Sequence, residues 1–285
     1  MQLSVCVTTI NAVNDLSFCL EALWKSSVKP SHIVVSDDSL APEIQQQNRQ
    51  IVDRYPHTDY VVGPHRGVCA NRNYALENLP PSDFVAFIDD DICVARDYIA
   101  NALSRYQTLK PEARQRTFLT GGTPTKLSFR GFFCKSDRPL CVDLHTAVFP
   151  TTFFKTQKWD EKIFFGYEDA LLCLQAIKQG YSILHCRELK VADTRSGKST
   201  LNVDGIGKLT KYDIYIEAAR LYVGIKRYKD IFPNPLKLAI FLLIYFIHMN
   251  IYLLRHKSIT AWSEIIRNSH FKDFYYLNFI APSKY

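Results

Sequence analysis

An apolar stretch that ends in three consecutive carboxylates is the most informative feature of this sequence. Residues 83–88 read Asp-Phe-Val-Ala-Phe-Ile and lead directly into Asp89, Asp90 and Asp91. Carboxylates this close raise one another's pKa unless a cation or hydrogen-bond donors absorb the charge. Mg²⁺ and similar hard cations take one or two protein carboxylates and share the phosphate oxygens of a substrate. The pattern therefore indicates a metal-diphosphate site, although an acidic turn whose first Asp caps the next helix would look the same.

A second pair of carboxylates opens a predicted helix later in the chain. Glu168 and Asp169 precede apolar residues at helical spacing, from Leu171 to Ile177, and Gly180 ends the segment. The dipole of a helix stabilises carboxylates at its N-terminus, and a carboxylate held there could act as a general base. Simple capping of the helix is the alternative.

The elements that must position these residues alternate between strands and helices. The expected strands span residues 3–9, 32–39, 59–62 and 83–89, and the expected helices span residues 14–25, 42–54 and 67–79. This alternation predicts an α/β domain with a Rossmann-like, mostly parallel sheet flanked by helices. Ligands of such sheets bind outside the carboxyl ends of the strands. The polar residues at those ends are Thr8, Thr9, Asp37, Asp38 and Asp89 to Asp91.

In its ordered motifs the sequence resembles the inverting glycosyltransferases of family 2, which have the GT-A fold. The resemblance covers about residues 3 to 200. The matching segments are Leu3–Thr9, Cys19-Leu20, Ile33–Ser39, Gly67–Asn73, Phe87–Asp91, Trp159–Asp169 and Gly180-Tyr181. Each segment is weak alone, but the ordered set is specific.

The resemblance implies roles for residues that match the family's motifs. The residues expected to bind the nucleotide sugar are Thr8, Thr9, Asp37, Asp38, Arg66, Arg72, Asp89 and Asp90. Of these, Thr8, Asp37 and Asp38 would contact the base and ribose. Asp89 would face the ribose, and Arg72 would lie near the diphosphate with Arg66 close by. A helix that starts after a glycine and carries arginines is also a plausible anion site on physical grounds.

The implied chemistry is sugar transfer with inversion, assisted by Mg²⁺ or Mn²⁺. Asp91 would ligate the metal, Asp169 would be the general base, and Glu168 would orient the acceptor. The family often has a histidine ligand after the next strand, where this chain has Asp193. Asp193 could replace it as an oxygen ligand or could only cap a loop. Arg195 and Lys198 could close over the diphosphate or remain solvated.

Composition predicts one large catalytic core and an appended element. The chain has 285 residues, of which 47% are hydrophobic, and eight cysteines without a Cys-x-x-Cys pair. We expect a GT-A catalytic domain over residues 1–207, with a nucleotide-binding half (1–100) and an acceptor half (101–207), followed by a helical extension over residues 208–285. The cysteines suggest free thiols of a reducing compartment, and the N-terminus lacks the basic start of a signal peptide, so we expect a cytoplasmic enzyme.

The extension holds all of the net charge. Residues 208–285 contain 12 Lys or Arg and 5 Asp or Glu, a surplus that equals the chain's net charge of +7. Only 17 mostly apolar residues separate Lys237 from Arg255, at the short limit for a membrane span, which needs ~20. We expect peripheral attachment to the inner face of an anionic membrane, and burial in the protein or a homodimer, or true spanning, stay open.

Specific residues should mediate this attachment. Insertion is expected from Phe241, Tyr245 and Trp262, and charge attraction from the basic cluster of Lys226, Arg227 and Lys229. Nucleic-acid binding is not expected, since the apolar tail carries no Arg-rich or RNA-binding motif.

Two other function classes compete with sugar transfer. A nucleotidyltransferase that makes sugar nucleotides is suggested by the Leu119–Thr123 segment with Gly121 and Gly122, although its glycine-rich loop should follow the first strand. A non-catalytic scaffold on the same fold is the other. The leading expectation remains transfer from a nucleotide-diphosphate sugar to a saccharide or lipid-linked saccharide in surface-polysaccharide synthesis, with sugar, base, acceptor and linkage unspecified.

Overall fold

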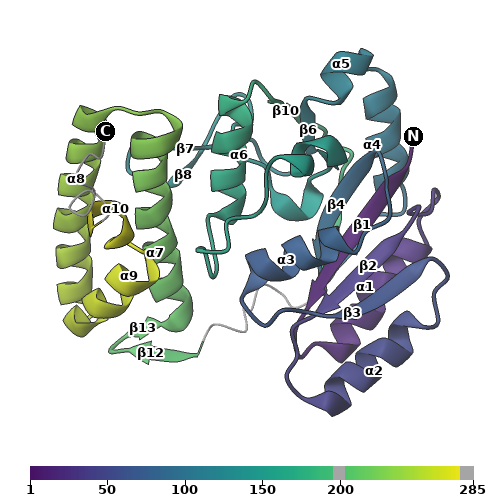
Figure 1. Cartoon of the computed structure of the whole chain (residues 1–285), viewed down its shortest axis with the longest axis horizontal. Coiled ribbons are helices and arrows are strands. Elements are labelled where there is room, and N and C mark those ends of the chain that lie inside the picture. The colour runs from purple at the N-terminus through teal and green to yellow at the C-terminus, as the bar shows by residue number, and fades with distance from the viewer. Residues whose placement is uncertain (195–202, 277–285) are drawn as a thin grey trace, which may run out of the picture.

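A five-stranded sheet forms the centre of the N-terminal half (Figure 1). The computed structural model describes residues 1–194 and 203–276, so Arg195 and Lys198 lie outside the described residues. The strand order is β3-β2-β1-β4-β9; the first four strands are parallel, and β9 is antiparallel to β4. The strands are β1 (Leu3–Thr9), β2 (Ile33–Asp37), β3 (Thr58–Val62), β4 (Phe84–Asp89) and β9 (Phe149–Pro150). This confirms the predicted mostly parallel α/β sheet.

Helices cover both faces of the sheet because its strands are apolar on both sides. Val5 and Val7 of β1 pack on one face with α1, α2 and α4, whereas Cys6 packs on the other face in the same cluster as residues of α3 and α6. Continuous apolar strands are typical of parallel sheets that are buried on both faces. The helices are α1 (Val13–Trp24), α2 (Pro42–Val52), α3 (Val68–Glu77), α4 (Tyr98–Gln107) and α6 (Glu168–Lys178).

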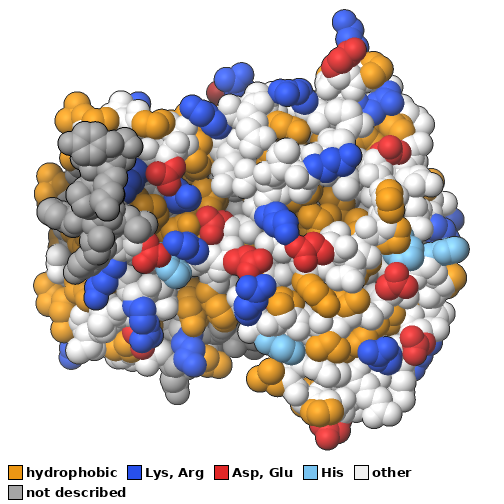
Figure 2. All heavy atoms as spheres, in the orientation of Figure 1, with side chains coloured by type: hydrophobic (Ala, Val, Ile, Leu, Met, Phe, Trp, Pro, Cys, Tyr) orange, Lys and Arg blue, Asp and Glu red, His pale blue; other side chains and the backbone are white. Residues whose placement is uncertain are grey.

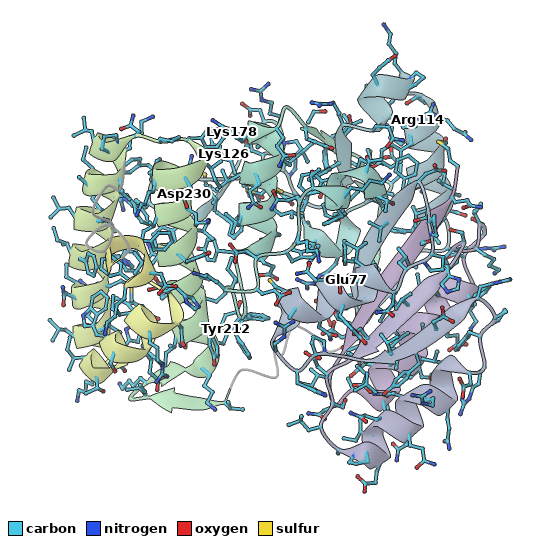
Figure 3. The ribbon with its side chains drawn as sticks, in the orientation of Figure 1. Glu77, Arg114, Lys126, Lys178, Tyr212 and Asp230 are labelled. Carbon is cyan, nitrogen blue, oxygen red and sulfur yellow. The ribbon has the colours of Figure 1, made fainter. Side chains whose placement is uncertain are left out.

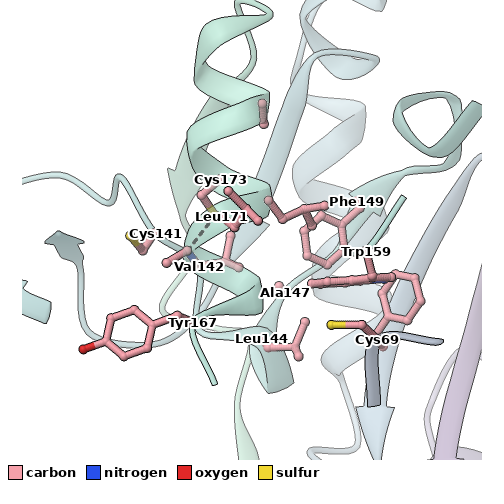
Figure 4. Packing of buried hydrophobic residues seen from close by; sticks show 14 of the residues in the cluster. Cys69, Cys141, Val142, Leu144, Ala147, Phe149, Trp159, Tyr167, Leu171 and Cys173 are labelled. Atoms are coloured by element: carbon pink, nitrogen blue, oxygen red, sulfur yellow. Dashed lines mark hydrogen bonds between the residues drawn. The ribbon is translucent and has the colours of Figure 1, made fainter. Parts of the chain in front are cut away.

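Short strand pairs complete the part of the chain before the C-terminal helices. β5 (Ile92–Val94) pairs with β11 (Val191–Asp193), and β6 (Thr117–Thr120) pairs with β10 (Ser182–His185). The remaining elements before residue 211 are α5 (Pro111–Arg114), β7 (Thr125–Leu127), β8 (Phe133–Lys135), η1 (Leu144–Thr146), η2 (Thr151–Lys155), β12 (Asp204–Ile206) and β13 (Leu209–Thr210). Figure 4 shows the core between α6 and the sheet, where Phe149, Trp159 and Leu171 pack together.

The C-terminal part is a helical bundle at one end of the molecule (Figure 1). Its elements are α7 (Lys211–Lys226), the π-helical turn η3 (Arg227–Ile231), α8 (Pro235–Arg255), η4 (Ile259–Ala261), α9 (Trp262–Asn268) and α10 (Asp273–Tyr276). A capping box of Thr210 and Asp213 starts α7, and Asn234 followed by Pro235 starts α8. Among the described residues, α8 is the single helix long and apolar enough to cross a membrane.

One side of α8 packs inside the bundle. Phe241, Tyr245, Met249 and Leu253 recur every fourth residue and are almost completely buried. Phe241 and Tyr245 therefore cannot insert into a membrane as we expected, because their rings fill the space against α7. Trp262 remains partly exposed and stacks on Phe246.

Arg220 of α7 connects the helical bundle to the segment between β7 and β8. Its guanidinium is buried, bonds Glu217 at 2.8 Å and donates to the carbonyl oxygen of Arg130 at 3.0 Å. The same group lies 4.3 Å from the ring of Phe132 and 4.5 Å from the ring of Tyr245. A planar cation can satisfy an acid, a carbonyl and two aromatic faces at once, so Arg220 fixes the packing of α7, α8 and the β7–β8 connection.

All eight cysteines are free thiols, as the sequence suggested. Six are buried, and Cys93 on β5 and Cys134 on β8 are partly exposed.

Candidate active site

Arg72 lies at the centre of the site, buried between β4 and α6. Its Nη2 atom contacts Asp89 Oδ1 at 3.0 Å, and its Nη1 atom contacts Glu168 Oε1 at 2.9 Å. The guanidinium lies 5.3 Å from the ring of Trp159. The two carboxylates come from sequence positions far apart, yet one side chain joins them. Arg72 thus links Asp89 at the end of β4 to Glu168 at the start of α6, because the guanidinium group has several N–H donors in one plane.

Local features of α3 explain why Arg72 points inward. The helix starts after Gly67, whose φ of 94° favours glycine, and an added Cβ there would lie 3.1 Å from the ring of Phe164. Asn73 then exchanges two hydrogen bonds, each of 3.0 Å, with the backbone of Trp159. These contacts fix the rotation of α3 about its axis, so that the arginine of the Asn-Arg-Asn motif points into the site.

Asp89 is held as a carboxylate by three neighbours. Besides Arg72, it accepts a hydrogen bond from Thr8 Oγ1 at 3.1 Å and contacts His145 Nε2 at 3.0 Å. Burial alone would raise the pKa of Asp89, but Arg72 and His145 outweigh burial and lower it. Asp89 therefore stays negatively charged, and Thr8 and Asp89 lie together at the strand ends as predicted. The contacts of Asp89 with a ribose and of Arg72 with a diphosphate stay predictions.

Sequence reasoning missed His145. It lies in the short turn η1, where no periodic pattern marks it, and its side chain is 37% exposed. Burial would lower the pKa of His145, but its bond to Asp89 raises it above the ordinary value. The sequence offered one weak signal that His145 belongs to the site, namely a histidine just before the strand β9.

Glu168 and Asp169 form the first turn of α6, as predicted. The chain enters the helix through Gly166 and Tyr167, both with positive φ, so the turn is sharp. Burial, and then repulsion by Glu168, raise the pKa of Asp169 to about 7. Glu168 Oε2 is buried without a hydrogen-bond partner in the described structure. The pair provides one carboxylate fixed by Arg72 and a neighbour that can take up a proton near neutral pH.

The two predicted metal ligands come from adjacent strands. Asp193 ends β11 opposite Ile92, and Thr194 N donates to the carbonyl oxygen of Asp91 at 2.8 Å. Asp91 thus lies opposite Thr194 and one residue out of register with Asp193, and binding of one metal by both carboxylates stays a prediction. Two carboxylates suit Mg²⁺ or Mn²⁺, which complete their shell with water and phosphate oxygens. Within residues 1–194 and 203–276 no group of three His, Cys, Asp or Glu side chains is placed to hold a metal by itself.

Asp37, at the end of β2, accepts hydrogen bonds from three protein groups. It is fully buried, and its oxygens accept bonds of 2.8 Å from Ser39 N, Asn48 Nδ2 and Tyr60 OH. These bonds tie β2 to α2 and β3. The Asp37 carboxylate therefore supports the fold, and its predicted contact with a nucleotide stays a prediction.

Three other residues that we predicted to bind the nucleotide sugar, Thr9, Asp38 and Asp90, are also buried. Asp38 accepts a bond from His65 N at 2.9 Å, and burial raises the pKa of its carboxyl group. Thr9 Oγ1 is buried without a hydrogen-bond partner in the described structure. Asp90 accepts a bond from Ile10 N at 3.3 Å. Their contact with a nucleotide stays a prediction.

The family model for glycosyl transferase family 2 matches residues 4–156, more than half of the chain. The chain belongs to this family. The match ends before α6, so the roles of Glu168 and Asp169 at the start of this helix stay a prediction from the sequence motif. No curated protein sequence matches the chain.

Solved structures of glycosyltransferases share the GT-A fold of this family member. S. aureus TarS 1–349 is 17% identical, with a TM-score of 0.58 over 94% of this chain and 81% of that one. TarS 1–349 in complex with UDP-GlcNAc is 19% identical, with a TM-score of 0.50 over 85% and 72%. The mannosyltransferase PcManGT from Pyrobaculum calidifontis, in complex with GDP-Man and Mn²⁺, is 14% identical, with a TM-score of 0.57 over 82% and 64%. Identities this low establish the fold alone.

Two sequence features lie apart from the Arg72 network in this glycosyltransferase. Arg66 pairs with Glu161 at 2.9 Å and is 65% exposed, so its predicted contact with a diphosphate stays a prediction.

The amides of Gly121 and Gly122 both donate to Thr146 Oγ1 at 3.0 Å. An added Cβ on Gly121 would lie 1.8 Å from the Leu189 carbonyl oxygen. The glycines thus serve close packing, which removes the feature that suggested a nucleotidyltransferase.

Proposed function

We propose that this protein is a metal-dependent, inverting glycosyltransferase that moves a sugar from a nucleotide-diphosphate sugar to a hydroxyl group of a saccharide or lipid-linked saccharide. One observation carries the proposal: Arg72 bonds both Asp89, at the end of β4, and Glu168, beside Asp169. A transferase must hold a donor and activate an acceptor within reach of each other. A single buried arginine that fixes both carboxylates supports that arrangement.

The proposed step transfers one proton and one glycosyl group. An acceptor hydroxyl oxygen forms a bond to the anomeric carbon as the bond from that carbon to the diphosphate oxygen breaks. The electron pair leaves with the nucleoside diphosphate, and the hydroxyl proton passes to the Asp169 carboxylate. Attack from the side opposite the leaving group inverts the configuration. A base with a pKa near 7 is matched to proton transfer at neutral pH.

Asp91 and Asp193 would hold the divalent cation. A bound Mg²⁺ or Mn²⁺ neutralises charge that develops on a departing diphosphate. The pairing of β5 with β11 brings the chain segments that carry Asp91 and Asp193 next to each other, which supports this pair. Use of a divalent cation is also supported by the structurally similar PcManGT, whose structure contains GDP-Man and Mn²⁺.

Aromatic side chains next to α6 support a saccharide acceptor. Phe164 is 44% exposed and stacks on Tyr215 at 4.5 Å, and Phe165 lies 5.5 Å from Tyr212. Figure 3 shows Tyr212 at the start of α7. Flat rings offer an apolar surface to the C–H faces of a sugar ring. These rings come from the residues just before Glu168 and from the first turns of α7.

A binding and product assay tests the proposal. Thermal unfolding is measured with UDP, GDP and their sugars, with and without Mn²⁺, because a ligand at 100 times its Kd adds about 2.7 kcal/mol of stability. We expect stabilisation that requires the metal, and release of nucleoside diphosphate from one donor. Formation of pyrophosphate would indicate a nucleotidyltransferase instead, and absence of any nucleotide effect would indicate a scaffold.

The proposed location of the reaction is the cytoplasm, in surface-polysaccharide synthesis. The eight free thiols support a reducing compartment.

A further inference from the structure

The outward side of α8 carries a continuous row of large aliphatic side chains. Their exposed fractions lie between 41% and 69%. We call them the outer face of α8: Leu236, Ile240, Leu243, Ile247, Ile251 and Leu254. In Figure 2, hydrophobic side chains gather along the edge of the molecule where Figure 1 places α8. Contiguous apolar surface of this kind marks a site of interaction rather than ordinary exposure.

The charges around this row are of one sign. α8 contains no Asp or Glu, Lys237 lies in its first turn, Arg255 ends it and Lys257 follows. All three basic residues are exposed. The surface is therefore an apolar strip, about 30 Å long at 1.5 Å per residue, with positive charge at both ends.

A second copy of the chain fits this surface poorly. Two outer faces packed antiparallel would bring Lys237 of one copy close to Arg255 of the other, and parallel packing would bring like residues together. Neither arrangement offers an acid on α8 to compensate the repulsion. Anionic lipid headgroups above an acyl layer supply both the negative charge and the apolar medium that the strip requires.

The packing of α8 also argues against a membrane span. Its opposite side is buried by Phe241, Tyr245, Met249 and Leu253, and Tyr245 OH donates to the Glu217 carbonyl oxygen at 2.8 Å. Lipid could surround α8 only if it separated from α7 and exposed Arg220 and Glu217. Lying lengthwise in the interface keeps every one of these contacts.

We propose that the outer face of α8 lies flat in the headgroup-acyl boundary of an anionic bilayer and attaches the enzyme there as a peripheral protein. Lys237, Arg255 and Lys257 then reach the headgroups. The basic cluster that the sequence suggested is not free for this purpose. Lys226 pairs with Asp230 at 3.1 Å, and Arg227 donates to the Ser128 carbonyl oxygen at 2.9 Å.

Sedimentation of the full chain with vesicles tests the proposal. The vesicles are phosphatidylcholine alone, or the same lipid with about one third phosphatidylglycerol. We expect binding to the anionic vesicles that weakens with salt. Leu243→Gln/Ile247→Gln should bind at least ~10-fold less, because two inserted aliphatic groups are lost. The matched control, Phe18→Gln/Leu40→Gln, alters residues that are 55% and 77% exposed elsewhere and should bind like the wild type.

Further measurements separate folding, assembly and catalysis from attachment. The α8 variant should keep the unfolding midpoint and the donor hydrolysis of the wild type, since both positions face away from the core. Equal binding by wild type and α8 variant, or equal binding to neutral and anionic vesicles, would overturn the proposal. So would a wild-type dimer in size-exclusion chromatography that the α8 variant converts to monomer. If the protein binds vesicles but does not hydrolyse a donor, the proposed function would be contradicted and the proposed attachment would not.

Discussion

Asp169 occupies an environment that costs stability. Burial and the adjacent Glu168 both disfavour its charged form, while Arg72 bonds Glu168 rather than Asp169. The result is a carboxyl group whose pKa of about 7 lies far above the usual range. A group used only for capping would gain nothing from this arrangement, whereas a general base would.

Replacing Asp169 by Asn should separate chemistry from binding. We expect kcat to fall by ~10²–10⁴, while the donor and Mn²⁺ still stabilise the protein in thermal unfolding. In the wild type, kcat/KM should rise with pH through about 7, because the base must lose its proton. If Glu168→Gln lost activity and Asp169→Asn kept it, the two roles would be reversed.

The same variant should be more stable than the wild type. Because the folded-state pKa of Asp169 is raised, the wild type loses stability as pH rises from about 4, the pKa in the unfolded chain, to about 7. Asp169→Asn removes this loss, so it should gain about 1–2 kcal/mol above pH 7 and progressively less toward pH 4. Urea unfolding at several pH values measures the difference. A gain that does not change with pH would contradict the assignment.

Asp91→Asn should uncouple donor binding from the metal. The substitution keeps the shape of the side chain but removes the charge that holds the cation, so stabilisation by a nucleotide sugar should no longer depend on Mn²⁺. Most activity should be lost with it. The matched control is Asp97→Asn, which alters a carboxylate that bonds Ser27 away from the site. Unchanged metal-dependent turnover in Asp91→Asn would remove Asp91 from the metal site.

Individual residues were predictable where a motif coincided with the end of an element. Thr8 and Asp89 meet as expected, because parallel strands bring their carboxyl ends to one edge, whereas the bonds of Arg72 to Asp89 and Glu168 were not predicted. His145 was not predictable, since its place depends on how η1 packs beside β4. The bonds of Asp37 to Asn48 and Tyr60 also depend on tertiary packing that local pattern does not reveal.

At the scale of elements, the packing of α8 on α7 depends on Arg220, which pairs with Glu217 of its own helix and contacts Tyr245 of α8. Arg220→Met would leave Glu217 buried without its partner, which should cost about 3 kcal/mol of unfolding free energy. The double variant Arg220→Met/Glu217→Gln removes the stranded charge and should recover part of the loss. Chemical denaturation of both variants measures this. Equal losses in the two would mean that the cation-π contacts of Arg220, rather than its charge pair, hold the helices.

The strands and helices before residue 90 were predictable almost to their ends. Apolar runs of strand length alternate there with helix-period segments, and β1 spans Leu3–Thr9 as expected. The orientation of α8 was not predictable from its composition. Aliphatic and aromatic residues alternate around the whole helix, so only the packing against α7 distinguishes the buried side from the outer face.

At the scale of the whole molecule, the helical bundle and the sheet share a core. Ala219, Tyr222 and Val223 of α7 belong to the same buried cluster as Leu171 of α6, and Tyr222 OH donates to Asp160 at 2.8 Å. The predicted boundary between residues 207 and 208 therefore divides the chain where side chains from both parts interlock.

A chain shortened to residues 1–207 should not fold on its own. Its α6 would expose apolar surface that α7 covers in the full chain, so we expect little soluble protein and no cooperative unfolding. Circular dichroism during heating checks this, with the full chain as the control. A cooperative transition together with nucleotide binding would show that residues 208–285 are an independent extension.

The two partly exposed thiols allow the native chain to be labelled for spectroscopy without engineering. Cys93 lies on β5, just after Asp91, and Cys134 lies on β8 next to Phe133, whose ring stacks on Tyr167 at the entrance to α6. The six buried thiols are shielded from maleimide reagents. A donor and an acceptor fluorophore attached to these two positions would therefore report the separation of β5 from β8. Changes in that separation could be followed in real time during a single turnover of the native chain.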